Sequence, residues 1–464
     1  MFLPLVFFLF SIKIHYLEIP PMGRVTSIAA SPNQLLIIND QRLLFLDKRE
    51  KFKIVYSYQP PERPTLLGYD IEYGDFWIIG VNNIYRINEY TYSTRYFKVE
   101  GASNIKSFAV GPNYLYWHKG QILVRFNKRN GKVEPTSSVP QEAKWFSLLT
   151  SEHLRQFPFL APYYFQDQRF NHYPITALLE VGLDLYVGTS GFGIFKYNSL
   201  TWEKSHIAFS PYTPDIRKLL KEPEGIYFLG DNSISFYNFS TDSFVNIRFD
   251  NNLDAVIPFQ NRFIINSANR LLSIEGNFVY PISEPIKNVT AFSHDGEDIL
   301  FATRDGLYRL NTKANATQFL GLADMYIYRI LTDSISIYAA TEFGLYQYER
   351  EKKSWERLIN LPFLDLMKFD KKHYLISFSH QLYELAGDSI RALPYMNINC
   401  FDSDGSRLYL GTSLGLAIYD PDRQSYRTAP YLPKDKINSI VVANDIVWLL
   451  TDRALLKIAV AELK

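Results

Sequence analysis

The sequence of 464 residues contains a single cysteine, Cys400. One cysteine cannot form an intrachain disulfide and cannot build a thiolate metal cluster. The eight histidines form neither an H-x-H nor an H-E-x-x-H pattern, which are the spacings expected of a compact metal site. We therefore expect no metal and no cofactor.

The sequence also lacks an excess of positive or negative charge, since it contains 49 Lys and Arg residues and 48 Asp and Glu residues. Without a basic surplus, nucleic acid is not an expected partner. Paired acids such as Asp402 and Asp404 lie in predicted turns, whereas the two carboxylates of a glycosidase face one cleft. No P-loop or dinucleotide fingerprint is found, and the G-x-S-x-G string at residues 411–415 lies between two predicted strands rather than at a strand-to-helix elbow. These absences favour a protein that is not an enzyme, without excluding catalysis.

Long hydrophobic runs are scarce. Residues 1–10, MFLPLVFFLF, are too few to cross a bilayer as a helix, and no other segment is as apolar. The run is similar to the apolar part of a secretory signal peptide, although no Lys or Arg precedes it and no A-x-A site follows. We expect a signal peptide over residues 1–12, no transmembrane segment, and a periplasmic or extracellular location. The alternative is a buried edge strand.

Aromatic residues are abundant at 16%, which favours strands. One unit of four short strands recurs, most clearly over residues 398–428. The first strands of the copies begin near Val25, Leu66, Ile105, Ile175, Ile216, Leu253, Val289, Ile327, Leu364, Ile398 and Ile437. Most steps are about 33 to 42 residues, as expected for four-stranded antiparallel units. The sequence predicts an all-β fold, a β-propeller of about eleven four-stranded blades.

Eleven blades exceed the roughly four to eight of a typical ring, so we expect two propellers, with one large ring as the alternative. The last unit contains only three strands, and residues 13–19 supply an unpaired one. We expect this N-terminal strand to pair with the last blade and close the circle, which protects the sheet edges. Residues 13–138 would then hold the closing strand and three blades, and residues 175–464 would hold eight.

Glycine marks the entrance to the third strand of the clearest units, where a tight hairpin requires positive φ. The expected turn glycines are Gly188, Gly193, Gly306, Gly344, Gly411 and Gly415. An aromatic residue opens the outer strand, as at Trp202, Trp355 and Tyr426. We expect these aromatic side chains to pack between blades rather than to bind sugars.

These Gly-Thr and turn patterns resemble the two-component regulator propeller repeat of periplasmic sensor domains. The resemblance is clearest in the units that begin at Ile175, Val289, Ile327 and Ile398, and it is weaker in the first three, which lack Gly-Thr. It implies a propeller with a sensing or binding role. The resemblance does not itself imply a signalling partner. Because this chain shows no kinase or DNA-binding domain, a separate membrane signalling protein is a further candidate partner.

Residues 139–174 interrupt the repeat. Residues 142–156 have the apolar spacing of a helix, and a run of aromatic residues follows. One interpretation is a cap or lid over a ligand. Its binding groups would be Trp145, Tyr163, Tyr164, Asp167, Arg169 and His172. The other is a structural plug at the seam between two propellers.

The expected function is that of a secreted or periplasmic propeller that binds, senses or scaffolds a protein, peptide or glycan. The alternative is a polysaccharide lyase or hydrolase with its cleft between propellers.

Overall fold

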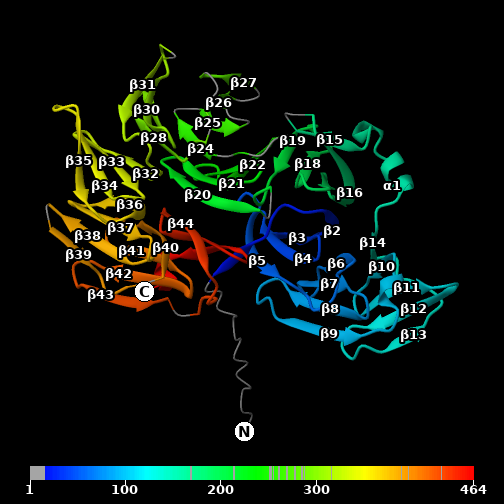
Figure 1. Cartoon of the computed structure of the whole chain (residues 1–464). Helices are drawn as coiled ribbons and strands as arrows, with labels where there is room; N and C mark the ends of the chain where they lie inside the picture. Colours follow the sequence, from blue (N-terminus) through cyan, green and yellow to red (C-terminus); the bar gives the residue numbers. More distant parts are fainter. Residues whose placement is uncertain are drawn as a thin grey trace, which may run out of the picture. The chain divides into compact units, whose positions relative to one another are not determined.

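The computed structural model describes residues 16–463 except 168–169, 213–214, 250–252, 254, 260–261, 268–269, 276–277, 284–285, 287, 315, 388, 396 and 430. The expected signal peptide lies outside the described residues. The chain divides into two compact units (Figure 1). Unit 1 comprises Met1–Pro214 and Tyr237–Asn246, and unit 2 comprises Asp215–Phe236 and Ile247–Lys464.

Unit 1 contains four sheets of antiparallel neighbours, in the orders β2-β3-β4-β5, β6-β7-β8-β9, β13-β12-β11-β10-β14 and β15-β16-β17-β18-β19. Their strands are β2 (Val25–Ala30), β3 (Gln34–Asn39), β4 (Arg42–Asp47), β5 (Lys53–Tyr58), β6 (Leu66–Asp70), β7 (Asp75–Ile79), β8 (Asn83–Asn88), β9 (Thr94–Lys98), β10 (Ser107–Val110), β11 (Tyr114–Lys119), β12 (Ile122–Asn127), β13 (Val133–Pro135), β14 (Lys144–Ser147), β15 (Tyr164–Gln166), β16 (His172–Val181), β17 (Asp184–Thr189), β18 (Ile194–Asn198) and β19 (Lys204–Ile207). The short helices are η1 (Ala102–Asn104), α1 (Ser151–Arg155) and η2 (Pro158–Leu160).

Six further sheets with sequential strand order run from β20-β21-β22-β23 to β40-β41-β42-β43. They belong to unit 2 except for Tyr237–Asn246, which holds the end of β22 and most of β23. Their strands are β20 (Ile216–Glu222), β21 (Gly225–Gly230), β22 (Ser233–Asn238), β23 (Ser243–Arg248), β24 (Ala255–Phe259), β25 (Arg262–Ser267), β26 (Arg270–Glu275), β27 (Phe278–Pro281), β28 (Ala291–Asp295), β29 (Asp298–Thr303), β30 (Gly306–Asn311), β31 (Ala316–Gly321), β32 (Ile327–Thr332), β33 (Ser336–Thr341), β34 (Leu345–Glu349), β35 (Ser354–Ile359), β36 (Phe363–Phe369), β37 (Lys372–Ser377), β38 (Leu382–Ala386), β39 (Ser389–Ala392), β40 (Ile398–Ser403), β41 (Leu408–Thr412), β42 (Gly415–Asp420) and β43 (Ser425–Thr428).

The last sheet contains β44 (Ile437–Ala443), β45 (Ile446–Thr451) and β46 (Leu455–Ala459), and η3 (Val460–Leu463) follows it. Its strand order is β1-β46-β45-β44, in which β1 is Leu17–Ile19. The strand expected over residues 13–19 is therefore the outer strand of the last sheet over its described part, since residues 13–15 lie outside the described residues. The chain is thus all-β, and each of the eleven expected units corresponds to one sheet.

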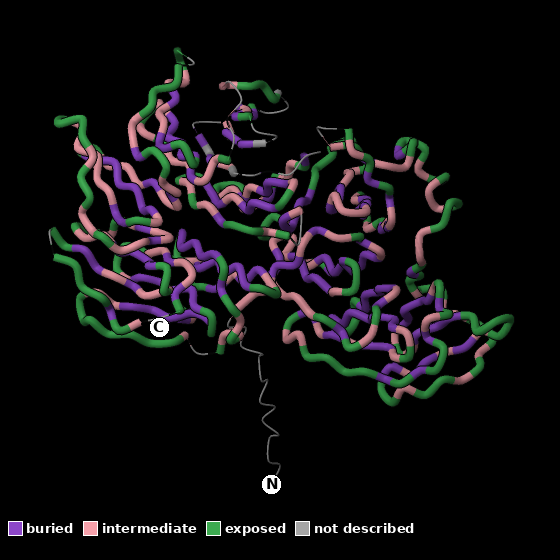
Figure 2. The backbone as a smooth tube through the Cα atoms, in the orientation of Figure 1, coloured by how far each residue is buried: buried purple, intermediate pink, exposed green. Residues whose placement is uncertain are grey.

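Burial changes across each sheet, and the sequence explains why. Second strands such as β33 are buried along their whole length, so they are nearly continuous runs of apolar and small residues. Fourth strands such as β39 and β43 are exposed throughout and carry polar residues (Figure 2). The first two strands of a sheet therefore lie inside the unit, and the fourth lies at its surface.

The core of unit 2 consists of layers between successive sheets. One cluster joins Tyr374 and Leu382 of β37 and β38 to Phe401 of β40. Similar clusters join β28–β31 to β32–β35, and β32–β35 to β36–β39. The first and last sheets of the unit also meet, because the Leu219 amide of β20 donates a hydrogen bond to Ser439 Oγ of β44 at 3.0 Å. Each sheet therefore buries its apolar faces against its neighbours.

The helix expected over residues 142–156 is wrong for most of its length. Residues 144–147 instead form β14, which pairs antiparallel with β10 from Val110↔Lys144 to Ser107↔Ser147. The open edge of β10 supplies backbone partners, and Phe146 packs on Phe108 with ring centroids 5.8 Å apart. These tertiary contacts override the helical spacing. The helix α1 starts only at Ser151, after Thr150 caps it by accepting a hydrogen bond from the His153 amide at 3.3 Å.

The six glycines fall into two kinds. Gly193, Gly306, Gly344 and Gly415 have φ values of 74°, 132°, 154° and 104°, which favour glycine. Gly188 and Gly411 differ from the expectation, because they lie inside β17 and β41 without positive φ. A Cβ atom on Gly188 would lie 2.7 Å from Val25 Cγ1, and one on Gly411 would lie 2.5 Å from Cys400 Sγ. At these two positions, glycine permits a close approach of inner strands.

The aromatic residues that open the outer strands also divide. Trp355 packs between two sheets and donates a hydrogen bond to the Leu320 carbonyl oxygen at 2.7 Å. Tyr426 stacks on Tyr395 with centroids 3.8 Å apart. Trp202 differs, because it is 63% exposed and forms an edge-to-face contact with Phe159 of η2. The interblade role therefore fits Trp355 and not Trp202.

Candidate functional site

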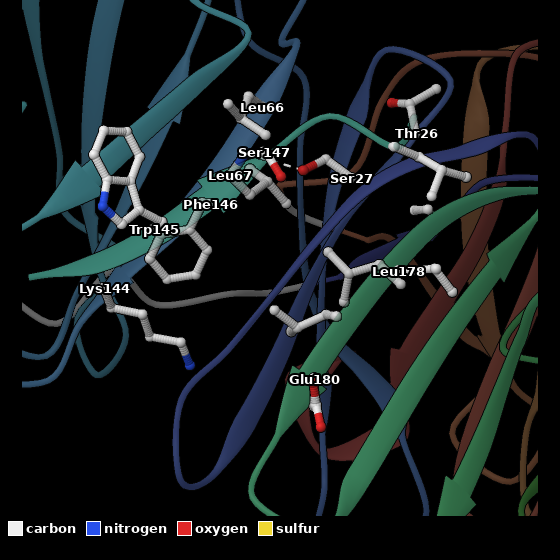
Figure 3. Close-up of a pocket in the computed structure, with 14 residues that line it drawn as sticks. Thr26, Ser27, Leu66, Leu67, Lys144, Trp145, Phe146, Ser147, Leu178 and Glu180 are labelled. Carbon is white, nitrogen blue, oxygen red and sulfur yellow. Dashed lines mark hydrogen bonds between the residues drawn. The ribbon is translucent and has the colours of Figure 1, made fainter. Parts of the chain in front are cut away.

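A pocket of about 190 Å³ lies on the inner strands of unit 1 (Figure 3). Four strands supply its walls, namely β2, β6, β14 and β16. Its polar side chains include Thr26, Ser27, Lys144, Ser147 and Glu180. The pocket therefore combines residues from three repeat units with one strand of the interrupting segment.

The wall formed by β14 depends on a glycine in the neighbouring sheet. Gly68 of β6 lies under this wall, and a Cβ atom there would come within 2.5 Å of Phe108 Cζ and 3.0 Å of Phe146 Cδ2. Because Gly68 has no side chain, the two phenylalanine rings can pack against β6. Lys144 then emerges at one end of β14 and Ser147 at the other.

The opposite wall contains two β-bulges at the same place in their strands. The pairing register shifts between Val25 and Ser27 in β2, and between Ile175 and Ala177 in β16. A bulge redirects side chains. Ser27 Oγ accepts a hydrogen bond from the Leu67 amide of β6 at 3.0 Å, and Thr176 Oγ1 donates one to the Val25 carbonyl oxygen at 2.6 Å. The bulges thus join β16, β2 and β6 into one continuous wall.

Two opposite charges line the pocket. Burial lowers the pKa of Lys144, whose ammonium group lies 5.6 Å from the centre of the Phe146 ring. Glu180 projects from β16 on the other wall (Figure 3). Within the part of the chain that the structure describes, neither side chain forms an ion pair. The pocket therefore offers a cationic donor and an anionic acceptor, together with hydroxyl groups.

Trp145 lines the pocket at its rim. Successive side chains of a strand point to opposite faces, so the indole of Trp145 lies on one face of β14 and the Lys144 side chain on the other (Figure 3). It is 46% exposed and lies parallel to the His118 ring, with centroids 6.5 Å apart. Of the five expected binding residues that the structure describes, Trp145 alone contributes to the pocket lining.

Tyr164, Asp167 and His172 come together elsewhere, in the β15–β16 hairpin. Tyr164 stacks on His172 with centroids 4.2 Å apart, and Gln166 Nε2 lies 2.6 Å from His172 Nε2. Asp167 holds the turn, since it accepts hydrogen bonds from the Asn171 amide at 3.0 Å and from the Tyr173 hydroxyl at 2.9 Å. Arg169 lies outside the described residues. The hairpin is thus internally bonded, with a half-buried Tyr164 stacked on an exposed His172.

Tyr163 belongs to a core cluster. With Leu160 and Phe165 it covers the face of the fourth sheet, where Ile175 and Phe195 lie. Phe165 and Phe195 stack with centroids 3.8 Å apart. The aromatic run of the interrupting segment therefore packs on this sheet in the way that a neighbouring sheet would. Such packing is the structural role that the plug interpretation gives to the segment.

Sequence reasoning missed Lys144, Glu180 and the bulge residues. Lys144 was not recognised because residues 142–156 were predicted to form a helix. Thr26-Ser27 and Thr176-Ala177 each follow a β-branched residue at the start of a first strand, and this shared position is the signal that could have identified them. Glu180 lies within an ordinary strand pattern and had no such signal.

Among the residues that the structure describes, no group of three or more His, Cys, Asp or Glu side chains could hold a metal ion. No helix within the same residues is long and apolar enough to span a bilayer.

No family model and no curated protein matches the chain. Among solved structures, it is similar to the extracellular domain of the putative one component system BT4673 from B. thetaiotaomicron, at 14% identity and a TM-score of 0.43. That match covers 94% of this chain and 75% of the other. A second structure, the extracellular domain of the putative hybrid two component system BT4673, matches at 13% identity and a TM-score of 0.42, covering 94% and 74% of the two chains.

Proposed function

We propose that this chain is a secreted or periplasmic binding module that senses a glycan through the pocket of unit 1. The observation that carries the proposal is a pair of opposite charges, Lys144 and Glu180, that form no ion pair among the described residues and line one pocket beside an exposed tryptophan. We further propose that a separate membrane signalling protein receives the signal.

The chemistry of the lining favours a ligand rich in hydroxyl groups. A sugar hydroxyl both donates and accepts hydrogen bonds, so it can satisfy an ammonium group, a carboxylate and the serine and threonine hydroxyls together. The pocket is smaller than the roughly 300 to 1,000 Å³ that encloses a drug-sized ligand. One sugar residue would therefore enter, while the rest of the glycan extends outward. Trp145 at the rim offers a flat face for a further sugar ring.

The lining also bears on the enzymatic alternative. Hydrolysis of a glycosidic bond takes two carboxylates on opposite sides of the scissile bond. Among the pocket residues, Glu180 carries the one carboxylate. This composition favours recognition over hydrolysis.

We also infer that unit 2 is a closed propeller of seven blades, with unit 1 supplying four more. The hydrogen bond between β20 and β44 and the apolar layers between successive sheets support closure. Residues 139–174 would cover the end of the four-sheet array in unit 1, since a terminal sheet otherwise exposes an apolar face.

The test is calorimetric titration of the full chain with maltohexaose, xylohexaose, oligogalacturonate and a mixed tetrapeptide set. We expect one of the oligosaccharides to bind. Glu180→Gln and Lys144→Met should each weaken that binding about tenfold or more, because each removes a hydrogen bond to a charged group. Trp145→Ala should weaken it less, because the indole lies at the rim.

Two variants serve as matched controls. Glu203→Gln and Trp202→Ala change exposed residues of the same unit that do not line the pocket, so they should bind the glycan like wild type. Binding of peptides alone, or equal affinity in Glu180→Gln and Glu203→Gln, would disprove the glycan proposal. Release of shorter or unsaturated sugars during the titration would instead identify a hydrolase or a lyase.

A further inference from the structure

The inner strands of unit 2 repeat the bulge that shapes the pocket of unit 1. Five of them shift register at their second residue: between Ile216 and Lys218, Ile327 and Arg329, Phe363 and Asp365, Ile398 and Cys400, and Ile437 and Ser439. The residues after the shift therefore occupy equivalent positions in five sheets. They are Lys218, Arg329, Asp365, Cys400 and Ser439.

Two of these five side chains are used for packing between neighbouring sheets. Ser439 Oγ accepts the hydrogen bond from the Leu219 amide. Cys400 Sγ donates to the Ile437 carbonyl oxygen of the next inner strand at 3.8 Å. The other three positions hold charged side chains, on β20, β32 and β36.

The three charged side chains act on one another across the unit. Burial lowers the pKa of Lys218, the nearby positive charge of Arg329 lowers it further, and Asp365 opposes both. The sheet of Lys218 and the sheet of Arg329 are separated in chain order by two other sheets. Lys218, Arg329 and Asp365 hold equivalent positions after the bulge, and Arg329 meets Asp365 of the next sheet at 3.4 Å, so we infer that all three side chains point toward the centre of the inner strands. Lys218 nevertheless keeps an exposed surface, as expected of a side chain that protein surrounds and water still reaches.

Lys218 and Arg329 each retain an N–H group without a hydrogen-bond partner among the described residues. Arg329 Nε lies 3.4 Å from Asp365 Oδ1, which is an ion-pair distance, but it has no hydrogen-bond partner among the described residues. Lys218 forms no ion pair or hydrogen bond within the same residues. Asp365 Oδ1 already accepts the Leu366 amide at 2.9 Å. One carboxylate thus faces two cations.

The next charged residues do not remove this surplus. Asp402 accepts hydrogen bonds from the Val442 amide at 2.7 Å and the Ser403 amide at 2.8 Å, so backbone groups occupy both of its oxygens. Lys221 and Arg329 are the cations that act on Asp402. Counting Lys218, Lys221 and Arg329 against Asp365 and Asp402 leaves one positive charge.

We propose that Lys218 and Arg329 bind a small tetrahedral oxyanion, phosphate or sulfate, at the centre of the inner strands of unit 2. An oxyanion accepts several hydrogen bonds and neutralises the surplus charge, so it can pair with both the free ammonium group and the guanidinium group of Arg329, whose side chain is 39% exposed. The site is independent of the glycan pocket of unit 1, and neither proposal requires the other.

The test is calorimetric titration of the full chain, at low ionic strength, with inorganic phosphate and with sulfate. Wild type should bind at least one of them. Lys218→Met should weaken binding about tenfold or more, and Lys218→Arg should restore it, because one charge-assisted hydrogen bond is lost and regained. Lys371→Met, in the exposed turn after β36, is the matched control and should bind like wild type.

A third titrant, glucose 6-phosphate, identifies the source of the anion. Tighter binding than inorganic phosphate indicates a phosphate ester, and failure to bind while phosphate binds indicates the free ion. Lys218→Met should fold, because Lys218 has no partner to lose among the described residues, and its thermal midpoint provides the check. Phosphate and sulfate affinities that are equal in wild type and folded Lys218→Met would overturn the proposal, as would no binding of either ion to wild type.

Discussion

The position after the inner-strand bulge differs between the two units. In unit 1 it holds the small residues Ser27 and Ala177. In unit 2 it holds Lys218, Arg329 and Asp365, together with Cys400 and Ser439. The backbone irregularity is the same, but small residues leave room for a pocket, whereas long charged residues fill the centre with charge. The same repeat therefore forms a pocket in unit 1 and a charged centre in unit 2.

Interblade ion pairs show a second contrast. Lys128 and Asp70 of unit 1 form an ion pair in which the side chains are only 5% and 4% exposed. In unit 2, Arg350 binds both oxygens of Asp295 at 2.7 Å, in a more exposed setting. Both pairs link successive sheets. The unit 1 pair should be the more costly to break, because burial makes an unpaired charge expensive.

The largest expected effect is therefore that of Lys128→Met. It leaves the Asp70 carboxylate buried without its partner, and we expect unit 1 to lose about 3 to 5 kcal/mol of unfolding free energy. Hydrogen exchange followed by mass spectrometry should show the loss in the sheets β6–β9 and β10–β14, with unit 2 protected as before. The double variant Asp70→Leu/Lys128→Met should recover much of the stability. Equal hydrogen exchange in wild type and Lys128→Met would show that the Lys128–Asp70 pair is not the more costly of the two ion pairs to break.

Gly344→Val should act on unit 2 almost as strongly. Gly344 has φ of 154°, and a Cβ atom there would lie 2.1 Å from the Ile359 carbonyl oxygen. Strain and overpacking together should cost about 3 kcal/mol. Denaturant unfolding measures this cost, and Gly387→Val provides a control with positive φ but open space around it. A midpoint for Gly344→Val at or above that of Gly387→Val would contradict the assigned hairpin.

Acid should weaken the Asp295 pair. Burial disfavours its carboxylate, but the hydrogen bonds and charges of Arg350 and Arg309 outweigh burial and lower its pKa. A carboxyl group with a depressed pKa in the folded state stabilises the fold above its unfolded pKa of about 3.9, and this contribution is lost as the pH falls through the folded value. Asp295→Asn should lower stability at pH 7 by about 2 kcal/mol and flatten the acid limb of the stability curve. If the stabilities of wild type and Asp295→Asn fell equally with decreasing pH, this stabilising role of the Asp295 carboxylate would be refuted.

The smallest effects should be alike in the two units. Ser27 and Ser439 each accept a backbone amide of a neighbouring inner strand at 3.0 Å. Ser27→Ala and Ser439→Ala should each cost about 1 kcal/mol, measured by hydrogen exchange at Leu67 and Leu219 respectively. A cost confined to one unit would show that the bulges are not equivalent.

Much of the fold could be predicted from the sequence because each repeat carries its own signals. The first strands at Val25, Leu66, Ile216, Ile327 and Ile437 begin where the pattern places them. The outer strand at Leu17–Ile19 was likewise expected, because the last unit lacked a fourth strand. Alternation and turn residues act within a few positions of each other, so they are visible without knowledge of the tertiary structure.

The candidate site was much less predictable. Trp145 was expected on a helix and lies on a strand, because the edge of β10 pairs with its backbone. Tyr163 was expected to bind a ligand and packs in the core of the fourth sheet. Both outcomes depend on which surfaces other units leave uncovered, and no local pattern records that.

By itself, the sequence determined the all-β class, the length of the repeat and four of the six expected places where glycine is needed for positive φ. Only the tertiary structure decided that Gly188 and Gly411 serve close approach, that Lys144 and Glu180 line one pocket, and that Arg329 and Asp365 meet between neighbouring sheets. The physical reason is distance along the chain. Strand and turn preferences arise between near neighbours, whereas a pocket or a charge cluster arises from residues that only the packing of separate sheets brings together.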